Sequence, residues 1–110
     1  MEIKGVPFCT TDWRSVERTG HPGESGTSFW QTFEQGNVRV RLVEYSPGYR
    51  ADHWCPRGHI LLVMEGDLVI ELRDGSRYRL TAGMSFQAED DEKNPHLAFT
   101  HTGATVFIVD

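Results

Sequence analysis

The stretch that decides the fold runs from Glu44 to Gly66 and reads EYSPGYRADHWCPRGHILLVMEG. It places His53, Cys55 and His59 just ahead of a long apolar run. Residues two apart on a β-strand point to the same side of a sheet, so a strand here would project His53 and Cys55 together. Imidazole and thiolate groups are the ligands that zinc, copper, nickel and iron accept in proteins. The leading interpretation is therefore a transition-metal site.

Each of these side chains also has an ordinary structural explanation. A single histidine on a half-buried strand is usually a hydrogen-bonded core residue, and cysteine is among the most buried residue types. For any one of the three residues, packing alone would be the better explanation. Their joint occurrence favours metal binding, while a metal-free fold in which they only pack stays open.

The composition is that of one globular domain. The chain has 110 residues, of which 38% are hydrophobic and 25% charged, enough for one core but too few for two domains. The net charge is −5, and no cluster of basic residues is available to neutralise phosphates, so we expect no nucleic-acid partner. No apolar run approaches the roughly 20 residues of a membrane helix, and the start does not read as a signal peptide. We therefore expect no membrane partner and a cytoplasmic location.

The remainder of the chain predicts strand after strand, with one helical turn over 13–18. Val38, Val40 and Leu42 alternate with other side chains in the period of two that is typical of a half-buried strand. Asp74-Gly75 is a strong hairpin signal. The expected strands cover 1–8, 28–34, 38–43, 49–55, 59–65, 68–72, 77–80, 84–88, 95–100 and 105–109. Short strands with almost no helix predict an all-β barrel or sandwich.

The deciding stretch resembles the first motif of the cupin superfamily of small β-barrels. Pro47-Gly48 opens the motif, His53 matches its first histidine and Gly66 matches its closing glycine. Cys55 stands where the second histidine belongs, and His59 where the glutamate belongs. Both replacements can still bind a metal. The chain looks most similar to compact single-domain members described as DHCW-motif cupin fold proteins.

The second cupin motif is matched more loosely. Gly83 and the segment 84–88 match its start, and Pro95-His96 resembles its end, so that His96 inherits the fourth ligand position. The acidic turn between them, 89–94, is longer than usual in the family. In all, the resemblance covers residues 38–110.

This resemblance implies an all-β cupin barrel, a double-stranded β-helix or jelly roll. The chain would be a single cupin domain over 1–110, with an N-terminal extension and strands over 1–37 and the barrel core over 38–110. The family is often homodimeric, and the aromatic N-terminal third exceeds what a small barrel needs inside, which indicates an interface. Those aromatic residues are Phe8, Trp13, Phe29, Trp30 and Phe33. We therefore expect a homodimer.

The resemblance also implies a divalent metal inside the barrel, held by His53, Cys55, His59 and His96. A thiolate ligand favours zinc, iron, nickel or copper over magnesium or calcium. Four ligands would close a tetrahedral zinc site and leave two positions open on an octahedral metal, and the sequence does not decide between these.

Other polar residues are weaker candidates for the site. On a regular strand His101 points away from the face that carries His96, unless a bulge shifts the register. His21 lies in a predicted loop. Arg39 and Arg41 share a strand face with Tyr45 and could meet an anionic substrate, although surface arginines are common.

Fold does not fix function, because cupins include enzymes of several classes and binding proteins without activity. Three hypotheses follow. The first is a metalloenzyme that acts on a small organic molecule by an unknown reaction. The second is a metal-holding or ligand-binding module without turnover. The third is a metal-free structural barrel.

Overall fold

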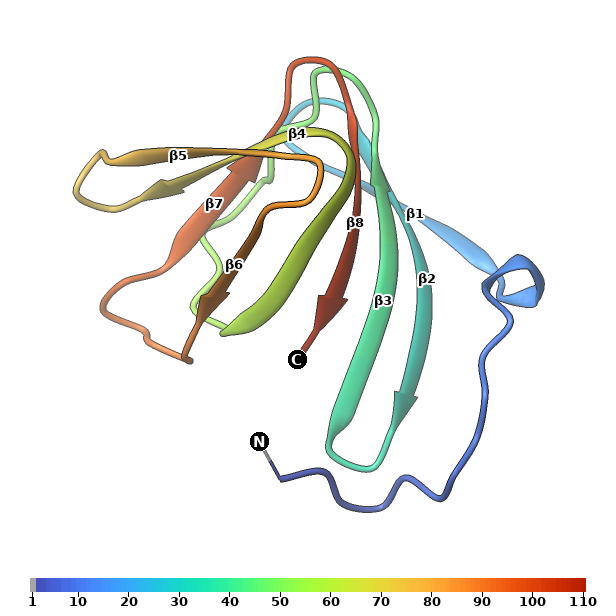
Figure 1. The fold of residues 1–110 in the computed structure, drawn as a ribbon. Helices are drawn as coiled ribbons and strands as arrows, with labels where there is room; N and C mark the ends of the chain where they lie inside the picture. Colours follow the sequence, from blue (N-terminus) through green and yellow to red (C-terminus); the bar gives the residue numbers. More distant parts are fainter. Residues whose placement is uncertain (1) are drawn as a thin grey trace.

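The computed structural model describes residues 2–110, which form two antiparallel sheets facing each other (Figure 1). The elements in chain order are the 3-10 turn η1 (Trp13–Ser15) and the strands β1 (Arg18–Pro22), β2 (Thr27–Gln35), β3 (Val38–Tyr45), β4 (His59–Leu72), β5 (Arg77–Thr81), β6 (Ser85–Ala88), β7 (His96–Phe99) and β8 (Ala104–Val109). No helix within 2–110 is long and apolar enough to cross a membrane. The predicted all-β fold class is confirmed.

Strand β4 belongs to both sheets. In the larger sheet the strand order is β1-β2-β3-β8-β4, and β6 pairs with the other edge of β4. The second half of β4 pairs instead with β5 and β7. Figure 1 shows β5 and β7 on one side and β1, β2, β3 and β8 on the other, with β4 curving from one side to the other. The hydrophobic core fills the space between them.

The core follows from the period of two along the central strands. On β8 the buried residues are Ala104, Val106 and Ile108, and on the first half of β4 they are His59, Leu61 and Val63. The side chains between them point outward. The strands before residue 38 belong to the same sheet, since β2 pairs with β3 from Ser28 to Gln35.

Several element boundaries differ from the prediction. The expected strands 59–65 and 68–72 are one continuous strand, because β4 changes partners instead of ending, with a register shift between Val63 and Glu65. The expected strand 49–55 is reduced to isolated bridges at Arg50 and Cys55. Residues 2–8 form no strand, and residue 1 lies outside the described residues. The predicted turn at 13–18 is confirmed in its first half, capped by Asp12, while Arg18 begins an unpredicted strand.

Gly66 allows β4 to continue through this irregularity. Its φ is +75°, and a Cβ atom at this position would lie 2.1 Å from the backbone oxygen of Gly103. Gly75, in the β4–β5 hairpin, also has positive φ, at +89°, but a Cβ atom there would meet nothing within 4 Å. An alanine at Gly75 would therefore cause backbone strain alone, whereas an alanine at Gly66 would cause both backbone strain and steric overlap.

We expect Gly66→Ala to destabilise the fold far more than Gly75→Ala. The hairpin variant bears only the strain of a left-handed backbone, about 1 kcal/mol. The Gly66 variant must also move β4 away from Gly103, which should bring the loss to on the order of 3 kcal/mol or more. Urea unfolding of both variants measures this, and equal losses would contradict the role given to Gly66.

Candidate metal centre and its cavity

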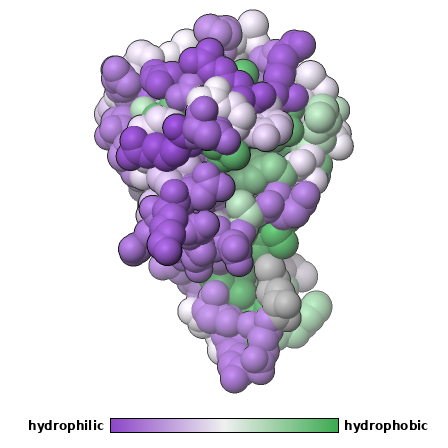
Figure 2. Space-filling view, turned by 90° about the vertical axis from the view of Figure 1, so that its left-hand side faces the viewer, coloured by the Kyte–Doolittle hydropathy of each residue, from purple (hydrophilic) through white to green (hydrophobic). Residues whose placement is uncertain are grey.

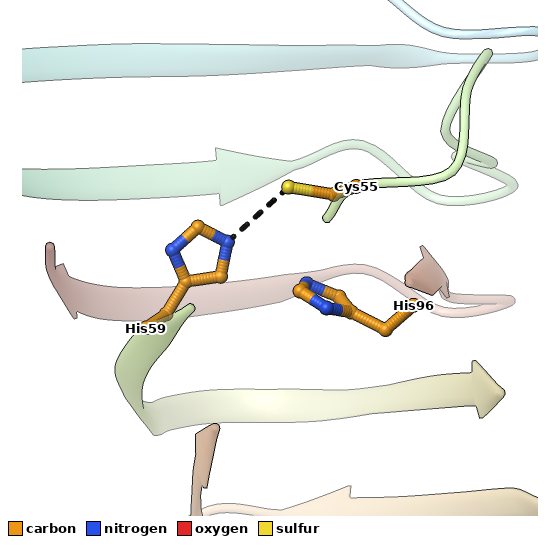
Figure 3. A group of neighbouring side chains, drawn as sticks. All are labelled: Cys55, His59 and His96. Carbon is orange, nitrogen blue, oxygen red and sulfur yellow. Dashed lines mark hydrogen bonds between the residues drawn. The ribbon is translucent and has the colours of Figure 1, made fainter. Parts of the chain in front are cut away.

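Three polar side chains from separate segments meet inside the molecule (Figure 3). They are Cys55, His59 and His96, and their ligand atoms all lie within 4.8 Å of one another. The Cys55 Sγ atom is 3.6 Å from His59 Nε2. The rings of His59 and His96 are 5.1 Å apart between centroids and nearly perpendicular, at 82°. Three of the four predicted ligands are thus brought together.

Backbone pairing sets these positions. Cys55 and His96 form an antiparallel bridge in which each amide donates to the other's carbonyl, at 2.8 and 2.9 Å. This bridge places the loop that precedes β4 along β7. His59 is the first residue of β4 and shares the inward face with Leu61. The site therefore joins one loop to the starts of two strands.

Asp110 orients the ring of His59. Its carboxylate accepts a hydrogen bond from His59 Nδ1 at 2.7 Å, and its side chain is only 2% exposed. Burial alone would raise the pKa of Asp110, but the hydrogen bond from Arg39 and the charges of Arg41 and Arg39 lower it to about 2. A carboxylate can only accept, so neutral His59 carries its proton on Nδ1. The lone pair on Nε2 is then directed at Cys55.

Burial also keeps the histidines neutral. It lowers the pKa of His59, although the charge of Asp110 opposes the shift. Burial, reinforced by nearby His59, lowers the pKa of His96 to about 4. Both rings are therefore unprotonated at neutral pH, and neutral imidazole is the form that binds metals.

The donor set fits a first-row transition metal. Bond lengths of about 2.3 Å to sulfur and about 2.1 Å to nitrogen place the two atoms about 3.6 Å apart at a tetrahedral angle and about 3.1 Å apart at a right angle. The Cys55 Sγ to His59 Nε2 distance, 3.6 Å, agrees with the tetrahedral value. Three protein ligands around a tetrahedral ion leave one position for another molecule.

The three ligands line a cavity of about 140 Å³ between the sheets. Its wall is mostly apolar and aromatic, with a few polar groups besides the ligands. The lining residues used below are Ser28, Trp30, Arg41, Tyr45, Ile70 and Ala98. A separate apolar groove of about 330 Å³ lies between β5 and β6, behind Phe86 and His96. Figure 2, viewed from the β4–β5 hairpin side, shows hydrophobic surface bordered by hydrophilic residues on this face.

The fourth predicted ligand, His53, is not brought into the group. It borders the same cavity, but its side chain is 74% exposed, and its Nδ1 lies 2.6 Å from the Asp52 carboxylate. The expectation that His53 and Cys55 share a strand face is wrong, because Cys55 forms only an isolated bridge and 51–54 are not strand.

The other histidines lie elsewhere, as the strand pattern predicts for His101. His101 is exposed and packs edge-on against Phe99, on the opposite side of β7 from His96. His21 stacks on Trp30 with 3.9 Å between ring centroids and contacts Thr19 through Nε2. Neither histidine belongs to the group of ligands.

Sequence reasoning missed Asp110. The signal was available, because Val106 and Ile108 face inward on β8 and residue 110 has the same parity. An acidic residue that follows a strand is usually exposed to solvent, so Asp110 was not considered as part of the site. Trp30 was also assigned to an interface, whereas it lines the cavity.

The buried histidines predict that the metal-free protein loses stability on acidification. Unfolded His96 binds a proton near its ordinary pKa of 6.5, whereas the folded protein resists protonation down to about 4. Between these values the unfolded state holds more protons, so the free energy of unfolding should fall by about 2 kcal/mol from neutral pH to about pH 5. Urea unfolding of chelator-treated protein measures this.

A variant pair isolates the effect. His96→Gln should remove this part of the pH dependence, while His101→Gln, at an exposed position, should retain it. A wild-type free energy of unfolding that does not change between neutral pH and about pH 5 would contradict the assignment.

Comparison with known proteins identifies the architecture. No family profile matches the chain, and no curated protein matches it in sequence. Solved structures do match. One match is a sugar phosphate isomerase of the cupin superfamily from the bacterium Silicibacter pomeroyi. It aligns with a TM-score of 0.74 and 22% sequence identity, and the alignment covers 92% of this chain and 74% of the isomerase chain. An RmlC-like cupin from Shewanella frigidimarina aligns with TM-score 0.72 and 20% identity over 90% and 86%.

A third match carries a metal. The iron(II) form of HppE, solved with an alternative substrate, aligns with TM-score 0.74 and 11% identity. The alignment covers 94% of this chain but only 60% of HppE. At these identities the likeness concerns the fold, which agrees with the two sheets and the cavity between them described above. The chain has the cupin fold.

Proposed function

We propose that this protein binds one first-row transition-metal ion through Cys55, His59 and His96, and a small organic molecule beside it in the cavity. The observation that carries the proposal is the convergence of three soft or borderline donors, from three segments, on the wall of one cavity. Zinc, iron, nickel and copper suit this donor set. HppE, a structural neighbour, was solved with Fe(II) and a substrate, which supports the same use of the fold.

The residues around the ligands would hold and orient the molecule. A bound metal would supply a Lewis acid for one oxygen of the ligand. Asp110 holds His59 with its Nε2 lone pair toward the metal position. Apolar side chains such as Ile70 and Ala98, which are paired between β4 and β7, line the same cavity and would contact the carbon part of the molecule. As a metalloenzyme, the protein would act on a small organic molecule bound beside the metal.

A metal-free barrel is the second candidate, and one contact favours it. The distance of 3.6 Å between Cys55 Sγ and His59 Nε2 also suits a hydrogen bond from the thiol to the ring nitrogen. In that case the three residues would only pack and hydrogen-bond, or would belong to a ligand-binding module without turnover. Metal stoichiometry distinguishes the two candidates.

Removal of His96 should abolish tight metal binding, while removal of His53 should not. His96 is a buried member of the group, whereas His53 would reach a metal only by giving up its contact with Asp52. We expect about one metal per chain in the wild type, a loss of at least ~100-fold in affinity for His96→Ala, and a change within a few-fold for His53→Ala. Elemental analysis and zinc competition with a chromogenic chelator measure this.

Two results would change the assignment. Equal losses in both variants would make His53 a fourth ligand and require the loop 51–58 to rearrange. Negligible metal in the wild type, with no stabilisation on adding zinc, would leave the metal-free candidate.

We also propose that the protein is a homodimer, through the outer face of β4. Ile60, Leu62 and Met64 point outward along β4, and Met84 lies beside them before β6. These side chains are 41–49% exposed, which leaves a contiguous apolar surface on the sheet. The N-terminal aromatic residues named above are half-buried in the monomer, apart from exposed Phe8.

A single charge on this surface should dissociate the dimer. We expect light scattering to give twice 12.5 kDa for the wild type and 12.5 kDa for Leu62→Glu, because a carboxylate would be desolvated in the interface. Phe8→Ser is the matched control at an exposed apolar residue outside this surface and should stay dimeric. A wild-type monomer at micromolar concentration would contradict the proposal.

A further inference from the structure

Arg41 is a buried cation with an unused hydrogen-bond donor. The residue is 5% exposed, and its Nε atom has no partner among residues 2–110. It lies on β3, on the inward face with Val43 and Tyr45, and it lines the cavity. A buried N–H without an acceptor is costly, since it has lost its contact with water and gained nothing in return.

The neighbouring carboxylate does not neutralise this site. Asp110 accepts two hydrogen bonds from Arg39, at 2.9 and 3.0 Å, and one from Arg41 Nη2 at 3.1 Å. The two guanidinium groups that hydrogen-bond to this carboxylate leave one positive charge in excess. Arg57 also lies 3.6 Å from the carboxylate, but its side chain is half exposed and its charge is screened by solvent. Neutral His59 adds no charge of its own. Burying such an excess is unfavourable unless a further anion balances it.

The ring of Trp30 compensates only part of the buried charge of Arg41. The Arg41 guanidinium carbon lies 4.5 Å from the centroid of the indole ring, a cation–π contact. The indole N–H donates to Ser28 Oγ, which holds the ring in place at the cavity wall. The face of a ring attracts a cation but is only a weak hydrogen-bond acceptor, so it does not replace a carboxylate oxygen. The charge of Arg41 therefore stays available to pair with an anion in the cavity that this residue lines.

We propose that the cavity binds a small carboxylate, which pairs with the guanidinium group of Arg41. A monoanion matches the single excess charge of Arg39, Arg41 and Asp110. The volume of about 140 Å³ accommodates on the order of six non-hydrogen atoms. Ile70 and Ala98 on the apolar wall would contact the carbon part of the acid. This inference deepens the proposed function, on which it rests for the choice of this cavity as the ligand site.

Titration with acetate tests the inference directly. In chelator-treated wild type we expect acetate, but not the neutral isostere acetamide, to shift the ¹⁵N-detected Arg41 Nε–H resonance in a saturable way. Arg41→Gln should weaken acetate binding, measured by calorimetry, by at least tenfold. Arg57→Gln is the matched control, since Arg57 lies 3.6 Å from the same carboxylate but does not line the cavity. It should bind acetate within about twofold of the wild type.

The outcomes separate this inference from the metal proposal. Acetate binding without metal uptake would keep the carboxylate site and overturn the metal centre. Metal uptake, with no saturable shift of the Nε–H resonance in either the metal-free or the loaded protein, would overturn the carboxylate site alone. An equal loss of acetate binding in Arg41→Gln and Arg57→Gln would also overturn it, since general charge would then explain the binding. The resonance is read in the wild type, so the test stands even if Arg41→Gln fails to fold.

Discussion

The buried carboxylate of Asp110 is the interaction on which the interior depends. It follows β8, takes hydrogen bonds from Arg39 and Arg41 on β3, and accepts one from His59 on β4. These three strands are adjacent in the sheet, so one side chain connects its centre. Breaking a buried pair by removing one partner typically costs several kcal/mol, because the other charge is left uncompensated. The same carboxylate holds the proton of His59 on Nδ1 and leaves the Nε2 lone pair unprotonated. Asp110 therefore contributes both to the stability of the fold and to the chemistry of the site.

Much of the fold could be predicted from the sequence because β-strands have a simple period. The strand predicted from the alternation at Val38 to Leu42 and the hairpin at Asp74-Gly75 depend on neighbouring residues, and both are confirmed, although the buried residues of the strand are Arg41, Val43 and Tyr45. The continuity of β4 could not be predicted, since Gly66 reads as a turn unless its partner strands are known. The loop before β4 was misassigned for a similar reason. Its register is set by Cys55 pairing with His96, a contact between residues far apart in the chain.

The site shows the same division. His59 and His96 could be predicted from spacing and resemblance, because regular strands deliver both to the interior. His53 was misplaced on a shared face because that argument needs a strand, and 51–54 lack one. Arg41 was noted only as one of several arginines that could meet an anion. Its importance comes from what surrounds it, namely a shared carboxylate and an unsatisfied N–H, and neither can be read from the order of residues.

The place of β8 has a consequence for how the chain reaches this structure. β8 is the last of the strands in chain order, yet it lies between β3 and β4 in the larger sheet. During synthesis the edges of β3 and β4 that pair with β8 therefore stay unpaired until β8 has left the ribosome. The contact between Arg41 and Asp110 likewise joins residues 69 positions apart in the sequence. Pairings of such sequence separation slow folding, and waiting edges with apolar residues such as Val40 and Leu61 invite pairing with other chains. Early release from the ribosome would leave an aggregation-prone fragment, not a smaller version of the fold.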